Sequence, residues 1–133
     1  MLDANLFSIS LQTKDRLPTL PFLRLKEKIL GKAYELSLVI VSDARSLTLN
    51  SEYRNKTYIP NVLSFPLDES HGEIFLNLKQ AKREVKERQE SFDYFVALLF
   101  IHSMLHLKGY RHGVTMECTE QTWLKKYHIN NLF

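Results

Sequence analysis

The segment that most restricts what this chain can fold into is SFDYFVALLFIHSMLHLK, residues 91–108. Ser91 is a good helix N-cap, Asp93 follows in the first turn, and the residues after them are apolar on nearly every side of a helix. The longest apolar run, FVALLFI at 95–101, is too short to cross a bilayer, which takes about 20 residues in a helix. A helix with no polar face must be covered on all sides, so the sequence predicts that this helix lies at the centre of a small domain.

The remaining hydrophobic patterns predict shorter elements around that helix. Alternating or β-branched apolar runs predict strands at 4–11, 37–42, 62–67 and 73–78. Helical spacing predicts helices at 22–36, from Asp43 behind a Ser42 cap to about Tyr53, at 78–90 and at 115–127. Strands and helices mixed along 133 residues predict one α+β domain that spans 1–133.

Two of these segments carry more specific expectations. Pro66 cannot donate a ladder hydrogen bond, so the strand at 62–67 is expected to stop there or to lie at an edge, and 62–78 can form a hairpin. The helix at 115–127 is expected to pack one side on the core, and that side carries Met116, Thr119, Trp123 and Tyr127.

Composition limits the class of protein rather than its activity. The chain is 44% hydrophobic and 25% charged, as expected for a soluble globular protein, and its net charge of +3 permits a nucleic-acid partner without requiring one. The single cysteine, Cys118, excludes an intrachain disulfide and fits a reducing compartment. The first residues, MLDANLFSIS, lack the basic start of a signal peptide, so we expect a cytoplasmic protein with no membrane partner.

Three of the five histidines lie within HSMLHLKGYRH, residues 102–112. His102 and His106 are four residues apart, so they lie one above the other on the same face of the predicted helix. Gly109 can adopt the left-handed conformation that ends a helix, and the returning chain then brings His112 to the same place. Three neutral imidazoles around an open fourth position are typical of a catalytic zinc site, although imidazole also suits other divalent ions.

The residue after the first histidine restricts the chemistry. Zinc proteases with this ligand spacing have a glutamate there as general base, whereas this chain has Ser103. Serine does not accept a proton near neutral pH, so the sequence argues against a peptidase. A pair of histidines four residues apart is by itself more often a hydrogen-bonded core pair, and the third histidine and the glycine favour the metal site. His71 and His128 lie outside the spacing and are expected at the surface.

These motifs together resemble those of the bacterial YbeY family, metal-dependent endoribonucleases of rRNA maturation. The family's His-Gly-x-x-His-Leu-x-Gly-Tyr-Asp-His is similar to HSMLHLKGYRH at 102–112. Its Leu-Asn-x-x-Tyr-Arg-x-Lys and Val-Leu-Ser-Phe-Pro blocks are similar to LNSEYRNK at 49–56 and VLSFP at 62–66, and its Gly-Asp-Ile is similar to Gly72-Glu73-Ile74. The resemblance covers most of the chain.

The chain departs from the family pattern at several positions, mostly where the family has an acid. Ser103 stands in place of a glycine and Arg111 in place of an aspartate. Thr57 replaces a second aspartate, and Ile59-Pro60-Asn61 replaces Pro-Thr-Asp. The three histidines are retained.

The resemblance implies an α+β fold in which a small mixed sheet of four strands packs beside a central helix that carries the metal ligands. It implies one zinc ion held by His102, His106 and His112. It also implies cleavage of single-stranded RNA, in maturation of the 3′ end of the small-subunit rRNA and in ribosome quality control. The partners it implies are a small-subunit ribosomal protein and a GTPase of ribosome assembly.

Catalytic and RNA-binding residues follow from the same blocks. Arg54, in the Tyr-Arg block, is expected to bind the phosphate whose negative charge grows in the transition state; without the resemblance, a surface ion pair is the simpler interpretation. His102 is predicted to be catalytic as a ligand of the metal. Contacts to the RNA backbone are expected from Arg54 and from three further cations, Lys56, Lys108 and Arg111.

Two other functions stay open at the level of sequence. One is a non-catalytic ribosome-assembly factor that binds RNA and protein while a structural zinc holds its fold. The other is a zinc hydrolase of a smaller phosphoester or amide, which needs a defined pocket and no basic surface. The general base is not assigned, and Glu73 is only a weak candidate for it.

Overall fold

The computed structural model describes residues 6–132 and has five helices and four strands within that range. In chain order these are β1 (Phe7–Leu11), α1 (Phe22–Ile29), β2 (Glu35–Ile40), α2 (Asp43–Arg54), β3 (Val62–Asp68), β4 (His71–Leu76), α3 (Leu78–Arg88), α4 (Phe92–Leu107) and α5 (Val114–Lys126). The order and type of these elements agree with the sequence prediction, and the α+β class is confirmed. Residues 4 and 5 of the first predicted strand lie outside the described residues.

Helix α1 is shorter than predicted, because it ends at Ile29 instead of continuing to residue 36. Gly31 follows with φ of 92°, in the left-handed region that favours glycine, and the chain turns there toward β2. Tyr34 therefore belongs to the connecting turn, and β2 begins at Glu35. The apolar residues before and after Gly31 have a helical spacing in the sequence, so the hydrophobic pattern did not reveal the turn.

The sheet is mixed, with the strand order β1-β2-β4-β3. β1 pairs with β2, and β2 with β4, in parallel, whereas β3 and β4 form the predicted antiparallel hairpin. β3 lies at an edge, and its register shifts between Pro66 and Asp68, because proline has no N–H to donate to the ladder. The predicted small mixed sheet is thus confirmed.

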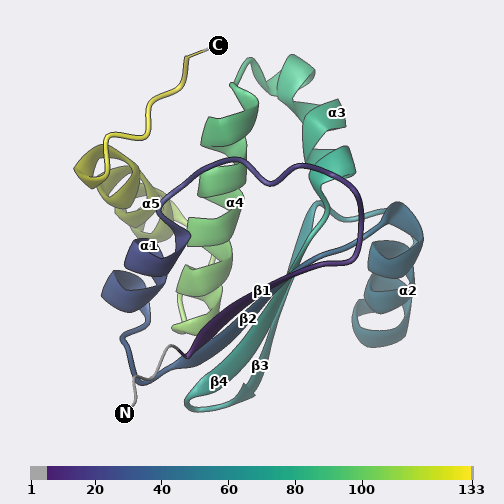
Figure 1. Ribbon diagram of the computed structural model, residues 1–133, viewed down its shortest axis with the longest axis horizontal. Coiled ribbons are helices and arrows are strands. Elements are labelled where there is room, and N and C mark those ends of the chain that lie inside the picture. The colour runs from purple at the N-terminus through teal and green to yellow at the C-terminus, as the bar shows by residue number, and fades with distance from the viewer. Residues whose placement is uncertain (1–5, 133) are drawn as a thin grey trace.

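Figure 1 shows the sheet between two unequal layers, with α1, α4 and α5 on one side and α2 on the other. Successive residues of a strand point to opposite faces. Ile74 of β4 accordingly packs in the main core beside α4, whereas its neighbour Phe75 packs in a smaller cluster with Leu49 of α2. The larger core lies on the side of α4.

Helix α4 occupies the central position that its sequence predicts. It contacts α1, α3 and α5 as well as β3 and β4. Phe95, Phe100, Ile101 and Leu105, which point to different sides of the helix, are each at most 2% exposed. None of the helices between residues 6 and 132 combines the length and the apolar character needed to span a membrane.

The side chains of Tyr34 and Leu107 pack against Gly72 in β4 and leave no room for a side chain at this position. A Cβ atom at this position would overlap the hydroxyl oxygen of Tyr34 and lie 3.1 Å from each methyl carbon of Leu107 in α4. The change Gly72→Ala is expected to lower the free energy of unfolding by about 1–3 kcal/mol, because these packed side chains must shift. Unfolding by urea, followed by far-UV circular dichroism, measures the change.

The double variant with Tyr34→Phe tests the cause of that loss. The Tyr34 hydroxyl is buried and makes no hydrogen bond within the described part of the chain, so removing its oxygen costs little. Because this oxygen is the nearest atom to the added methyl, Tyr34→Phe is expected to restore most of the stability of Gly72→Ala. A Gly72→Ala protein as stable as the wild type would contradict the packing described here.

Candidate metal centre and its groove

Three histidines converge where α4 ends. His102 and His106 lie on successive turns of α4, and Gly109, with φ of 105°, ends the helix and donates its N–H to the His106 carbonyl at 3.0 Å. The chain then returns, so that the ring centroid of His112 lies 5.0 Å from that of His102 and 4.5 Å from that of His106. One ring nitrogen from each histidine lies within 4.8 Å of the other two. The three residues can therefore hold one metal ion.

Hydrogen bonds at Nδ1 orient the two helical histidines. His102 Nδ1 lies 2.5 Å from a carboxylate oxygen of Glu120 in α5, and His106 Nδ1 lies 3.1 Å from the carbonyl oxygen of Tyr110. A carboxylate and a carbonyl oxygen accept hydrogen bonds, so each Nδ1 carries the proton and donates it. Each Nε2 then keeps its lone pair, which is how a metal-binding histidine with an acceptor behind its ring is arranged.

The two Nε2 atoms lie 3.1 Å apart. Two lone pairs at this distance repel each other unless a proton or a cation lies between them. Burial lowers the pKa of His106 below its usual range, and the neighbouring His102 lowers it further, so a proton on the Nε2 of His106 is disfavoured. The donor set therefore fits a divalent metal ion held by imidazole nitrogens.

The histidines line a groove of about 720 Å³. Its lining residues come from α4 between Phe95 and Leu107, from the ends of α2 and α3, from strand β3 and from α5. The charged side chains that line the groove besides the histidines are Arg54, Lys56, Arg88, Glu117 and Glu120. A volume of this size is typical of a ligand-binding site.

Arg54 is held in this groove by contacts with the edge strand. It is the last residue of α2. Its terminal nitrogen donates to the Ser64 carbonyl at 2.6 Å, and its guanidinium lies 4.9 Å from the centroid of the Phe65 ring. Both contacts restrict the plane of the guanidinium, which prepares its remaining N–H groups for a planar acceptor such as a phosphate.

The other predicted cations are divided between the groove and other parts of the surface. Lys56 lines the groove together with Arg54. The ammonium of Lys108 donates to the Ile29 carbonyl at the end of α1, at 3.0 Å, and neither Lys108 nor Arg111 is among the groove residues. Contacts of Lys108 and Arg111 with RNA therefore stay predictions, because neither residue lines the groove.

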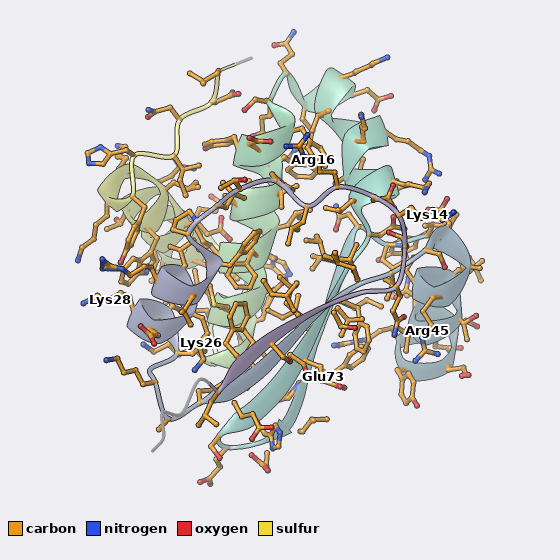
Figure 2. The ribbon with its side chains drawn as sticks, in the orientation of Figure 1. Lys14, Arg16, Lys26, Lys28, Arg45 and Glu73 are labelled. Carbon is orange, nitrogen blue, oxygen red and sulfur yellow. The ribbon has the colours of Figure 1, made fainter. Side chains whose placement is uncertain are left out.

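Glu73 points away from the histidines. Its neighbour Ile74 packs in the core beside α4, so Glu73, labelled in Figure 2, points to the opposite face of the sheet. There it lines a separate small cavity with Ser8 and Ser37. Glu73, the candidate named for the general base, does not line the groove of the histidines, and the general base stays unassigned.

Glu120 was not predicted from the sequence. Helix α5 buries Met116, Glu120 and Leu124, which are spaced four residues apart. The predicted core side, with Trp123 and Tyr127, is displaced from this stripe, and both aromatic residues are only half-buried. The signal was available, because an acid between two apolar residues at helical spacing faces the core, where a carboxylate needs a partner.

Comparison with known proteins identifies relatives over most of the chain. The family model described as Endoribonuclease YbeY matches residues 11–131. Three proteins named Endoribonuclease YbeY are similar to this chain. The protein of Finegoldia magna is 41% identical over 108 residues, which are 72% of this chain and 71% of that protein. The protein of Mycoplasma mycoides is 35% identical over 105 residues, 64% of each chain, and that of Clostridioides difficile is 38% identical over 109 residues, 74% of this chain and 71% of that protein. The chain thus spans between 64% and 71% of the length of these relatives.

A solved structure supports the fold. The solution structure of TM1509 from Thermotoga maritima matches with a TM-score of 0.64 over 91% of this chain and 88% of that one. The sequences are 22% identical. The similarity therefore concerns the arrangement of the backbone and carries no conclusion about activity.

Proposed function

The chain belongs to the YbeY family of endoribonucleases, and from that premise we propose that it is a zinc-dependent endoribonuclease of single-stranded RNA. The observation that carries the proposal is the convergence of His102, His106 and His112 in a groove that Arg54 also lines. A metal ligand set and a phosphate-binding cation in one cavity are what hydrolysis of a phosphodiester requires.

The biological setting that we propose comes from the family resemblance. The substrate is the 3′ end of the small-subunit rRNA, and the activity serves its maturation and ribosome quality control in the cytoplasm. The partners are a small-subunit ribosomal protein and a GTPase of ribosome assembly. We also propose that residues 1–133 form a single YbeY-like domain.

Zinc is the ion that we propose for the three histidines. When bound, it supplies a Lewis acid for a phosphoryl oxygen and lowers the pKa of a coordinated water. The protein's part is to keep each ring in place. Glu120 accepts the Nδ1 proton of His102, and the Tyr110 carbonyl accepts that of His106, so that both Nε2 lone pairs stay available to the metal.

Arg54 and Lys56 bind the phosphate in this proposal. The guanidinium of Arg54, held by Ser64 and Phe65, neutralises charge that grows on the phosphoryl oxygens in the transition state. Lys56 adds a second cation to the lining of the groove. The groove is the size of a small-ligand site, so it admits a single strand of a few nucleotides more easily than a duplex.

Cleavage of a circular single-stranded RNA tests this proposal. A circle has no ends, so only an endonuclease can convert it to a linear product of the same length. We expect the zinc-loaded protein to linearise the circle and to leave a circle annealed to a complementary strand largely intact. A circle that stays intact under conditions in which the folded protein has bound zinc would contradict the proposal.

The variant Arg54→Ala is expected to lower kcat/KM for a single-stranded RNA by about 10²-fold, the usual cost of a lost donor to a developing oxyanion. Zinc content is expected to stay at the wild-type level, because Arg54 is not one of the three histidine ligands. Arg54→Lys keeps the charge without the planar fork and is expected to recover only part of the rate. A wild-type value of kcat/KM for Arg54→Ala would show that Arg54 does not take part in the reaction.

A further inference from the structure

Arg88 lies in the groove, toward the end of α4 that is far from the histidines. It is the last residue of α3, and its guanidinium lies 4.4 Å from the centroid of the Phe95 ring. Phe95 is 2% exposed, and both residues line the groove. Arg88 therefore has a guanidinium whose position is restricted by an aromatic face.

Hydrogen bonding leaves part of this guanidinium available. Its Nε donates to a carboxylate oxygen of Glu90 at 2.7 Å. Between residues 6 and 132, neither of its terminal nitrogens has a hydrogen-bond partner. Two N–H groups of a single guanidinium can bind two oxygens of one phosphate, so Arg88 keeps the donors that such a contact needs.

The distance along α4 relates Arg88 to the metal ligands. Phe95, on which Arg88 packs, is two helical turns from His102, or about 10 Å at 1.5 Å per residue. Phosphates of one strand are about 3.4 Å apart along the axis of a duplex and further apart in an extended single strand. A strand that lies along α4 with one phosphate at the histidines therefore brings a phosphate roughly one to three nucleotides away close to Arg88.

We propose that Arg88 binds an RNA phosphate that flanks the scissile one. This inference rests on the proposed endoribonuclease function and adds a requirement to it: the substrate must extend past the cleavage site on the side of Arg88. Arg54 acts on the phosphate at the histidines, whereas Arg88 holds the strand along the groove. Arg88 is in this sense a substrate-binding residue, and its loss acts on affinity rather than on the chemical step.

Binding and cleavage of a single-stranded RNA of about 12 nucleotides, within the usual size range of single-strand sites, test the proposal. The variant Arg88→Gln removes the charge but keeps most of the side chain that covers Phe95. We expect Kd and KM to rise about tenfold, kcat to stay within about twofold, and the slope of log Kd against log salt to fall by about 0.7. Kd is measured by fluorescence anisotropy with zinc-loaded protein.

The matched control is Lys86→Gln. Lys86 is exposed on the same helix, carries the same charge and is not among the groove residues. Its loss is expected to change Kd by less than about twofold, as for a surface charge outside the path of the strand. The two variants therefore separate a contact in the groove from a general loss of positive charge.

The outcomes distinguish this inference from the proposed function. Equal Kd and equal salt slope for Arg88→Gln and Lys86→Gln, with wild-type cleavage intact, would overturn the role of Arg88 alone. A wild-type protein that binds the RNA without cleaving it would overturn the proposed function, and the Kd comparison would still decide on Arg88. A folded, zinc-loaded wild type that neither binds nor cleaves would overturn both.

Discussion

Replacement of His106 by alanine is expected to lower cleavage of single-stranded RNA by at least about 10³-fold, because the metal-dependent part of the rate is worth several kcal/mol and each 1.36 kcal/mol is tenfold. His106 supplies one of only three histidine nitrogens in the cluster, and it is the one nearest to both others by ring distance. Zinc content per chain is expected to fall together with the rate. Cleavage of an end-labelled RNA and elemental analysis of the same sample measure both quantities.

The control for this variant is His128→Asn. His128 is exposed and lies beyond α5, and asparagine tolerates its φ of 56°. Purified in the same way, this protein is expected to cleave RNA at the wild-type rate, so cleavage that remains in His106→Ala measures any contaminating nuclease. If folded His106→Ala and His128→Asn cleave equally fast, the histidine cluster is not the active site.

Loss of the Glu120 carboxylate is expected to weaken zinc binding by about 10- to 100-fold, the usual effect of removing a group that orients a metal-binding histidine. Glu120 is 7% exposed, and its carboxylate oxygen lies 2.5 Å from Nδ1 of His102. In Glu120→Ala the His102 ring is free to turn or to change its tautomer, so its Nε2 is no longer fixed toward His106. Competition with a chelator of known affinity measures the zinc affinity.

Two further variants separate orientation from charge. Glu120→Gln keeps an acceptor oxygen of nearly the same shape and is expected to recover part of the affinity. Glu117→Gln removes a carboxylate from the same groove, one turn earlier on α5, and is expected to change the affinity by less than threefold or so. Equal zinc affinity in wild type and Glu120→Ala would show that Glu120 does not position His102.

The elements that the sequence predicts well are those whose pattern is local and strong. The apolar run of α4 leaves one position for that helix, at the centre of the domain, and the structure confirms it. The grouping of His102, His106 and His112 also depends on a local pattern, because one helical turn and the left-handed residue Gly109 bring the three side chains together. Pro66 likewise marks β3 as an edge strand.

The parts that the sequence does not predict depend on contacts between distant segments. Glu120 faces His102 because α5 packs against α4 with the side that carries Met116 and Leu124, whereas the aromatic residues of α5 favoured a neighbouring side. Lys108 follows the histidines closely in sequence, yet its side chain reaches the end of α1. Arg88 enters the groove only because α3 ends beside Phe95. Proximity in sequence is a poor guide to a site built from five elements.

The most direct test of the proposed metal-dependent active site compares three forms of one preparation: as purified, stripped of metal with a chelator, and restored with zinc. The substrate is a single-stranded RNA that carries the 3′ end of the small-subunit rRNA. We expect cleavage to disappear on stripping and to return in proportion to the zinc bound, up to one ion per chain at His102, His106 and His112. Undiminished cleavage by folded, metal-free protein would contradict the assignment of these histidines as the catalytic centre.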